Sequence, residues 1–357
     1  MSLATGWTQI FPPHNGAPLT EDNLPSQIGK VFIVTGGSSG LGYHLSRVLY
    51  GAGGKVYILT RTRQHAEDAI ARIKIYYQDR NEGTLEAQRG SLELIYMDLL
   101  DFATVQAAAQ QFLQSEGPDG RLDALFNNAG TGAVRNAPKS KQGCEYHFCV
   151  NSIGAHLLTR LLMPMLSKTA AQSPKDGVRV VWPASMLVEM MSPKDGIRKT
   201  FLENPDSVTN QNELYSSSKT ANWFLASEFT RRQMAADETA GTTTPSSQPP
   251  GVVHIAGNPG NYVTNIWRSV PAWTYYLTRP ILRDPIHGVE TYLWMAFSDS
   301  VTFERVLAGG YAICDGRWHP GQRKDLLLAL KGEGEGGSGR ASEYFDWCET
   351  TVKDFVN

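Results

Sequence analysis

Residues 31–42 read V-F-I-V-T-G-G-S-S-G-L-G, and this stretch decides the fold. Residues 31–34 are a short apolar run with β-branched members, which predicts a strand buried on both faces. A glycine-rich turn follows Thr35, and an amphipathic run with helical spacing begins at Leu41. Strand, glycine turn and helix form the first unit of a dinucleotide-binding fold. The glycines let the backbone approach a pyrophosphate, and the helix N-terminus supplies free N–H groups.

The glycines of this turn are Gly36, Gly40 and Gly42, with Thr35 in front of them. This T-G-x-x-x-G-x-G spacing differs from the more common G-x-G-x-x-G. The alternative interpretation is an ordinary tight turn between a strand and a helix, so the rest of the chain has to decide.

The composition is that of a soluble globular protein. The chain has 357 residues and a formal net charge of −2, so we expect no nucleic-acid partner. Four scattered cysteines form no C-x-x-C pair and have no histidine cluster beside them, so we expect no metal site and reduced thiols. No apolar stretch approaches the ~20 residues of a membrane span, and from the proline-containing first 30 residues we expect no signal peptide. We therefore expect a cytoplasmic protein.

Strand and helix patterns alternate along the chain. Strands are predicted at residues 31–34, 55–60, 92–97, 122–126, 178–183, 252–256 and 310–314, and helices at 41–52, 64–77, 104–113, 145–167, 215–234, 286–297 and 343–355. This pattern predicts an α/β fold of the Rossmann type: a doubly wound, mostly parallel, seven-stranded sheet with helices on both faces. We expect one domain at residues 31–315. An irregular N-terminal arm, residues 1–30, would dock through Trp7 and Phe11, and a C-terminal extension, residues 316–357, would end in a helix.

Three positions carry side chains suited to acid–base chemistry. Tyr215 and Lys219 stand four residues apart at the start of a predicted helix, so they share one face. A nearby ammonium lowers the pKa of a phenol and makes it a better proton carrier, although such pairs also occur by chance. Ser185 ends the fifth strand, at the sheet edge where ligands bind. Its alternative role is to cap a turn.

Asn151 lies inside a predicted helix that is otherwise apolar on one face. Asparagine is unfavourable in a helix interior, so a polar role in the core is indicated, with an ordinary packed asparagine as the alternative.

Taken in order along residues 30–300, these motifs resemble the short-chain dehydrogenase/reductase family. The matching positions are Thr35, Gly36, Gly40, Gly42, Asp98, Asn127, Asn128, Ala129, Gly130, Asn151, Ser185, Tyr215, Lys219, Pro259, Gly260 and Thr264. Within the family, the runs N-P-G-N-Y-V-T, Y-S-S-S-K-T-A-N and G-R-W-H-P-G are similar to retinol-dehydrogenase-like members and to fungal oxidoreductases, some of which are associated with secondary-metabolite biosynthesis. Ala184, Trp182 and Pro183 depart from the family pattern, and we expect them to reshape the carbonyl pocket.

The resemblance implies a role for each matching residue. Tyr215 would be the general acid/base, and Lys219 would lower its pKa and hold the nicotinamide ribose. Ser185 would polarise the carbonyl, and Asn151 would hold a water that links Lys219 to solvent. Asp98 would bond to the adenine. The cofactor would contact Gly36, Ser38, Ser39, Gly40, Leu41, Gly42, Asp98, Asn128, Ala129, Gly130, Tyr215, Lys219, Pro259, Gly260, Tyr262 and Thr264.

The end of the second strand indicates which nicotinamide cofactor is used. NAD-preferring sheets carry a carboxylate there, whereas this chain has Arg61 and Arg63. A guanidinium pairs with a 2′-phosphate through a bidentate fork, so we predict NADP(H), with Arg61 as the main contact and Ser38 or Arg63 assisting. Two solvated surface arginines are the alternative.

The substrate is expected beside Tyr215, under residues 186–213 and 265–283. Both segments are rich in methionine or aromatic residues, which favours a hydrophobic ketone, aldehyde or alcohol. Core packing, a subunit contact and a peripheral membrane contact are alternatives, and a homodimer stays open. A cofactor-binding sensor or scaffold without turnover is the competing function, and a sugar epimerase is a third.

Overall fold

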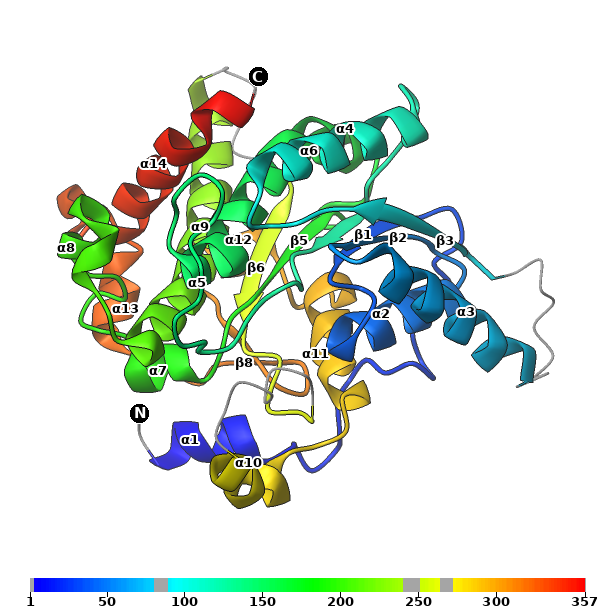
Figure 1. The fold of residues 1–357 in the computed structure, drawn as a ribbon, viewed down its shortest axis with the longest axis horizontal. Helices are drawn as coiled ribbons and strands as arrows, with labels where there is room; N and C mark the ends of the chain where they lie inside the picture. Colours follow the sequence, from blue (N-terminus) through cyan, green and yellow to red (C-terminus); the bar gives the residue numbers. More distant parts are fainter. Residues whose placement is uncertain (1–2, 80–88, 240–250, 264–271, 357) are drawn as a thin grey trace.

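The computed structural model describes residues 3–79, 89–239, 251–263 and 272–356. One sheet runs through the middle of the molecule in the order β3-β2-β1-β4-β5-β6-β7-β8 (Figure 1). Its strands are β1 (Val31–Thr35), β2 (Lys55–Thr60), β3 (Ser91–Tyr96), β4 (Ala124–Phe126), β5 (Arg179–Pro183), β6 (Val253–Gly257), β7 (Ala312–Ile313) and β8 (Arg317–Trp318). All neighbours pair in parallel except β7 and β8.

The predicted fold class is confirmed, with eight strands in place of the predicted seven. The additional strand, β8, has two residues and turns back on β7. Asp315 and Gly316, both with positive φ, form the turn between them. A two-residue strand has no periodicity of its own, so the sequence pattern could not reveal it.

Helices cover both faces of the sheet (Figure 1). The longer ones are α2 (Gly40–Gly51), α3 (Arg63–Asp79), α4 (Phe102–Glu116), α6 (Gly154–Ala171), α9 (Gln211–Thr239), α11 (Ile286–Phe297) and α14 (Arg340–Val352). The shorter ones are α1 (Leu3–Ile10), α5 (Tyr146–Phe148), α7 (Leu187–Met191), α8 (Lys199–Glu203), α10 (Ala272–Thr278), α12 (Phe303–Leu307) and α13 (Lys324–Ala329).

The first strand shows why its sequence is apolar throughout. Successive side chains of a strand point to opposite faces of the sheet. Ile33 packs into one apolar cluster with residues of α4, α6, α9 and α14, whereas Phe32 and Val34 pack into a second cluster with α2 and α11. Both faces of β1 are therefore buried, and the topology reverses direction between β1 and β4. Ligands of doubly wound sheets bind at the carboxyl ends of the strands at such a reversal.

The N-terminal arm differs from its prediction. Residues 3–10 form α1 instead of irregular chain. Trp7 and Phe11 do not dock the arm, since their exposed fractions are 66% and 41%. Among the residues of α1 whose burial is described, the buried side chains are instead polar, namely those of Thr5 and Gln9. Hydrogen bonds from these side chains hold the helix, and an apolar pattern does not reveal such contacts.

Candidate active site

The glycine turn joins β1 to α2 in a tightly closed conformation. Gly36 and Gly40 have φ of +65° and +54°, which favours glycine. A Cβ on Gly42 would lie 2.4 Å from the carbonyl oxygen of Gly36, so only glycine fits there. The N–H of Gly36 donates to the carbonyl of Leu59 at the end of β2 (2.7 Å). The turn is thereby fixed between the carboxyl ends of β1 and β2.

The serines of this turn, Ser38 and Ser39, stand directly before α2. Ser39 is the N-cap residue of α2, but within the described residues its side chain does not cap the helix. The first N–H groups of α2, including that of Leu41, are left to bind an anion. The hydroxyl of Ser38 lies 3.2 Å from that of Thr60, at the end of β2.

The segment after β4 closes the other side of the crevice. The amide Nδ2 of Asn128 donates to the carbonyl of Thr35 (2.9 Å), and the N–H of Ala129 donates to the hydroxyl of Thr35 (2.8 Å). Gly130 follows, and a Cβ there would lie 2.9 Å from Oδ1 of Asn151 and 3.2 Å from Nζ of Lys219. Gly130 therefore gives the backbone close access to both side chains.

Asn151 lies in the π-helical segment η2 (Cys149–Ile153), which interrupts the helix predicted at residues 145–167. Such wide turns inside α-helices are frequently found at functional sites. Oδ1 of Asn151 accepts from the N–H of Thr131 (2.8 Å), and Nδ2 donates to the hydroxyl of Ser218 (2.9 Å). The side chain thus ties the segment after β4 to α9. The expected water bridge to Lys219 stays a prediction.

Tyr215, Ser185 and Lys219 meet at the carboxyl end of β5. The side chain of Ser185 lies close enough to the hydroxyl of Tyr215 to act on its pKa. Oγ of Ser185 also accepts from the N–H of Leu187 (3.2 Å). Nζ of Lys219 donates to the carbonyl of Pro183 (3.3 Å). Both Tyr215 and Lys219 are buried, so a proton donor and a cation lie together in a low-dielectric site.

The pKa of Tyr215 is shifted in the direction opposite to the one expected. Burial raises the pKa of Tyr215, and the side chain of Ser185 opposes that shift. Burial also lowers the pKa of Lys219 from 10.5 to about 8, so its charge is weakly held. Tyr215 therefore keeps its proton at neutral pH, which is the state of a proton donor.

Arg61 and Arg63 follow β2 directly and are both exposed. Neither guanidinium forms an ion pair or hydrogen bond with the described residues. Asp98 lies on the neighbouring strand end, because the N–H of Met97 donates to the carbonyl of Thr60 (3.0 Å). Oδ1 of Asp98 accepts from the N–H of Leu100 (3.0 Å). The two arginines are thus available beside the glycine turn.

The segment after β6 lies at the same edge of the sheet. Gly260 has a φ of +116°, and a Cβ there would meet the hydroxyl of Tyr262 at 2.5 Å. The carbonyl of Pro259 accepts from the hydroxyl of Thr291 (3.2 Å). Tyr262 is buried and donates to the carbonyl of His287 (3.2 Å). Thr264 lies outside the described residues, as does the part of the expected substrate segment at 265–271.

Trp182 does not reshape the carbonyl pocket as expected. It is fully buried, and its ring stacks with those of Phe229 and His254 in the core. Because side chains alternate along β5, Trp182 points to one face of the sheet while the strand end carries Ser185.

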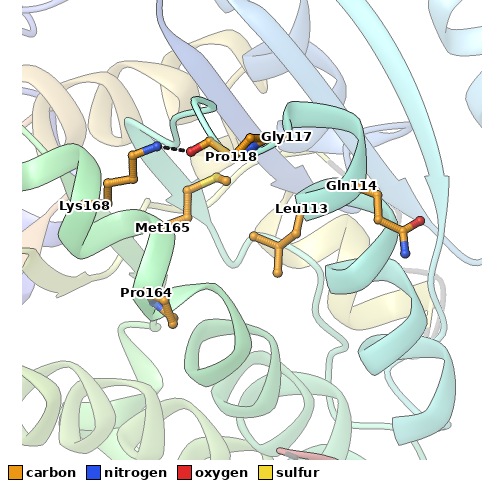
Figure 2. Close-up of a pocket in the computed structure, with 7 residues that line it drawn as sticks. All are labelled: Leu113, Gln114, Gly117, Pro118, Pro164, Met165 and Lys168. Carbon is orange, nitrogen blue, oxygen red and sulfur yellow. Dashed lines mark hydrogen bonds between the residues drawn. The ribbon is translucent and has the colours of Figure 1, made fainter.

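An open groove lined by residues of α4 and α6 lies away from these residues. Leu113, Pro118, Met165 and Lys168 are among the residues that line it (Figure 2). Pro118 precedes the amino end of β4, whereas Asn128 follows its carboxyl end. The groove is therefore at the opposite edge of the sheet and does not belong to the candidate active site.

Four polar residues near the site were missed by the sequence reasoning. The hydroxyl of Tyr311 donates to the carbonyl of Ser185 (3.0 Å). Glu189, His319 and Gln9 form a buried hydrogen-bonded group next to α7. One signal was present: Glu189 is a lone carboxylate in an apolar run, and a buried carboxylate requires donors from elsewhere.

Neither a membrane-spanning helix nor a metal cluster is found in the part of the chain that the structure describes. No helix there is both long and apolar enough to cross a bilayer. No group of three or more histidine, cysteine, aspartate or glutamate side chains there could hold a metal ion.

The sheet topology and the glycine turn define a Rossmann-type, dinucleotide-binding fold. A family model described as short chain dehydrogenase matches residues 30–191. A short-chain dehydrogenase/reductase from Phomopsis amygdali is 36% identical, with 99% of this chain and 98% of that protein covered. The short-chain dehydrogenase/reductase bet4 from Neocamarosporium betae is 33% identical, with 99% and 94% covered. The chain therefore belongs to the short-chain dehydrogenase/reductase family and is an oxidoreductase by class.

Solved structures agree with this fold. RhlG of Pseudomonas aeruginosa, in a complex with NADP, gives a TM-score of 0.55 at 23% identity, with 82% of this chain and 98% of that chain covered. The 3-ketoacyl-(acyl-carrier-protein) reductase of Brucella melitensis, in a complex with NADH, gives 0.53 at 21% identity, with 81% and 97% covered. At these identities the likeness concerns the fold alone.

Proposed function

We propose that the chain is an NADP(H)-dependent oxidoreductase that interconverts a hydrophobic ketone or aldehyde and its alcohol. The observation that carries the proposal is the arrangement at the carboxyl end of β5, where Tyr215 interacts with Ser185 and where Lys219 contacts Pro183 and lies beside Gly130. A buried proton donor, a hydroxyl beside it and a buried cation are the groups that carbonyl reduction needs.

The glycine turn fits a dinucleotide. Gly36 and Gly42 leave no room for side chains, and the N-terminus of α2 is free to bind a pyrophosphate. When bound, the reduced nicotinamide supplies a hydride to the carbonyl carbon. Solved relatives of the same fold hold NADP in one case and NADH in another, so the choice between them rests on this chain's own residues.

The protein's residues handle the proton. The hydroxyl of Ser185 donates to the carbonyl oxygen of the substrate and orients it. As the hydride adds to carbon, the O–H of Tyr215 gives its proton to that oxygen and becomes a phenolate. The ammonium of Lys219 stabilises the phenolate, and a proton from solvent then restores the phenol of Tyr215. The raised pKa of Tyr215 favours the protonated state and therefore the direction of carbonyl reduction.

NADP(H) is proposed because no carboxylate ends β2. Arg61 is exposed and directly follows Thr60, whose hydroxyl lies 3.2 Å from that of Ser38. A 2′-phosphate bound there would meet a guanidinium and a hydroxyl. An aspartate at the same position would instead accept from a 2′-hydroxyl.

A hydrophobic substrate is proposed from the side chains near Ser185. Met190 and Met191 of α7 are 49% and 42% exposed, although both are apolar. Polarizable, flexible thioethers suit an apolar ligand of irregular shape.

A cytoplasmic location and a homodimer remain parts of the proposal, and light scattering of the purified chain tests the homodimer.

The experiment is an NADPH-oxidation assay against retinals, steroids, polyketide ketones and aliphatic aldehydes. Tyr215→Phe is expected to lower turnover by about 10²–10⁴-fold, because it removes the general acid, and to retain NADPH binding in a fluorescence titration. Tyr96→Phe, which changes an exposed tyrosine on β3, is the matched control and is expected to keep full activity. Turnover that survives Tyr215→Phe rules out the mechanism. NADPH binding with no turnover of any carbonyl by the unmodified chain favours the sensor or scaffold.

A further inference from the structure

The N-terminal helix α1 is attached to the rest of the molecule through the side chain of Gln9. Only 2% of this residue is exposed. Its Nε2 donates to Oε2 of Glu189 (2.9 Å), and its Oε1 accepts from Nδ2 of Asn258 (3.1 Å). One amide therefore bridges two residues that are far apart in the sequence.

The two partners belong to two different walls of the candidate active site. Glu189 is in α7, four residues after Ser185, and Asn258 precedes Pro259. The segments that lead to Glu189 and to Asn258 leave the sheet side by side, because the N–H of Ala184 donates to the carbonyl of Gly257 (2.7 Å). Past this bond, the side chain of Gln9 links Glu189 of the first segment to Asn258 of the second.

Glu189 is held in a defined position, which makes it a fixed anchor for Gln9. The N–H of Gly321 donates to Nδ1 of His319 (3.1 Å), so a neutral ring carries its proton on Nε2. That N–H donates to Oε2 of Glu189 (3.1 Å), and burial lowers the pKa of His319, which keeps the ring neutral. The hydroxyl of Thr5, also in α1, donates to Oε1 of Glu189 (3.3 Å).

The end of α1 is fixed as well. A guanidinium N–H of Arg317 donates to the carbonyl of Thr8 (2.6 Å) and to that of Phe11 (3.2 Å). A cation at the last carbonyls of a helix satisfies acceptors that have no partner inside the helix. Trp7 is exposed, and among the residues of α1 whose burial is described the buried side chains are the polar ones of Thr5 and Gln9. Buried polar contacts of this kind fix the orientation of the elements that they join more than they add to the stability of the fold.

We propose that Gln9 is a positioning residue for the active site, because it sets the separation between the segment that carries Ser185 and the segment that carries Gly260. This inference rests on the proposed function, in which the first segment holds the carbonyl and the second lines the nicotinamide site. The separation of the two segments then sets the distance over which the hydride moves. A misplacement of ~1 Å lowers the rate of such a reaction by up to about 10²-fold.

Gln9→Leu tests the proposal, because leucine is of similar size and makes neither hydrogen bond. We expect kcat to fall about tenfold or more and the dissociation constant of NADPH to rise. Trp7→Ala is the matched control on the same helix, and its kcat is expected to stay within about twofold of the unmodified chain, because Trp7 is exposed. If Gln9→Leu does not fold, Gln9→Asn replaces it, since the shorter amide does not span both partners.

Hydrogen–deuterium exchange gives a readout that does not depend on turnover. Gln9→Leu is expected to raise amide exchange in both residues 185–191 and residues 258–262, whereas Trp7→Ala raises it in neither. If the unmodified chain reduces no carbonyl, the proposed function fails while the exchange experiment still decides whether Gln9 joins the two segments. Unchanged kcat and unchanged exchange in both segments, with only a lower unfolding temperature, would show that Gln9 merely anchors the arm and would overturn the inference.

Discussion

Replacing Lys219 by methionine is expected to stabilise the protein without cofactor. Burial lowers the pKa of Lys219 from 10.5 to about 8 in the folded state. Because one pKa unit corresponds to about 1.4 kcal/mol, holding this ammonium in the site costs about 3 kcal/mol at pH 7. Methionine has a similar length and no charge. The carbonyl of Pro183 keeps its other donor, Nδ2 of Asn222 (2.8 Å). We therefore expect Lys219→Met to raise the free energy of unfolding by about 2–3 kcal/mol.

The sign of the pH dependence follows from the lowered folded-state pKa. Between pH 8 and pH 10.5 the unfolded chain binds more protons at Lys219 than the folded chain does, so the stability of the unmodified protein rises with pH relative to the variant. The advantage of Lys219→Met is complete below pH 8 and disappears near pH 10.5.

Urea unfolding of both chains at pH 7 and at pH 9–10 measures this difference. Lys199→Met, at an exposed position of α8, is the matched control and is expected to change the free energy of unfolding by less than about 0.5 kcal/mol. A Lys219→Met variant that is less stable than the unmodified protein at pH 7, or a difference that does not shrink with rising pH, would refute the reasoning that the buried ammonium destabilises the fold.

Three further substitutions test individual contacts. Arg61→Asp is expected to raise the KM for NADPH about tenfold or more in initial-rate assays, because hydrogen bonds to charged groups are worth about 1.5–3 kcal/mol; equal shifts of the KM for NADPH and NADH would contradict the assignment. Gly42→Ala is expected to lower the free energy of unfolding by about 2 kcal/mol and to weaken NADPH binding, because the added Cβ would lie 2.4 Å from a backbone oxygen. Gly321→Ala is the control and is expected to be neutral, because its added Cβ would meet open space. Tyr311→Phe removes the donor to the carbonyl of Ser185 and is expected to lower kcat while leaving the KM for NADPH unchanged.

The sheet could be predicted from the sequence because each strand carries its own local pattern. The run at residues 31–34 is apolar throughout because Ile33 faces one apolar cluster and Phe32 and Val34 face the other. The expected strand at 55–60 coincides with β2. The strand β8 escaped prediction because two residues have no period, and its pairing depends on the turn at Asp315 and Gly316.

The sequence shows which residue types stand at the candidate site and in which order along the chain. It does not show how deeply each of their side chains is buried. The spacing of Tyr215 and Lys219 indicates a shared helix face, and from this we expected a lowered tyrosine pKa. Burial instead raises the pKa of Tyr215 and lowers that of Lys219. The segments that bury these two side chains are distant in the sequence, so the four-residue spacing does not reveal them. The bridge through Gln9 was equally hidden, because its partners lie 180 and 249 residues further along the chain.

Lys219 is difficult to explain by folding alone. Within the described residues its ammonium has a single carbonyl acceptor, that of Pro183, although an ammonium has three protons to donate. An apolar side chain of the same length would fill the space and stabilise the fold. Gly130, which leaves room next to Nζ, exposes the same nitrogen to anything bound at the end of β4. A ligand with hydroxyl groups at that place would supply the missing acceptors, and the proposed cofactor role of Lys219 would thereby account for the cost of burying its ammonium.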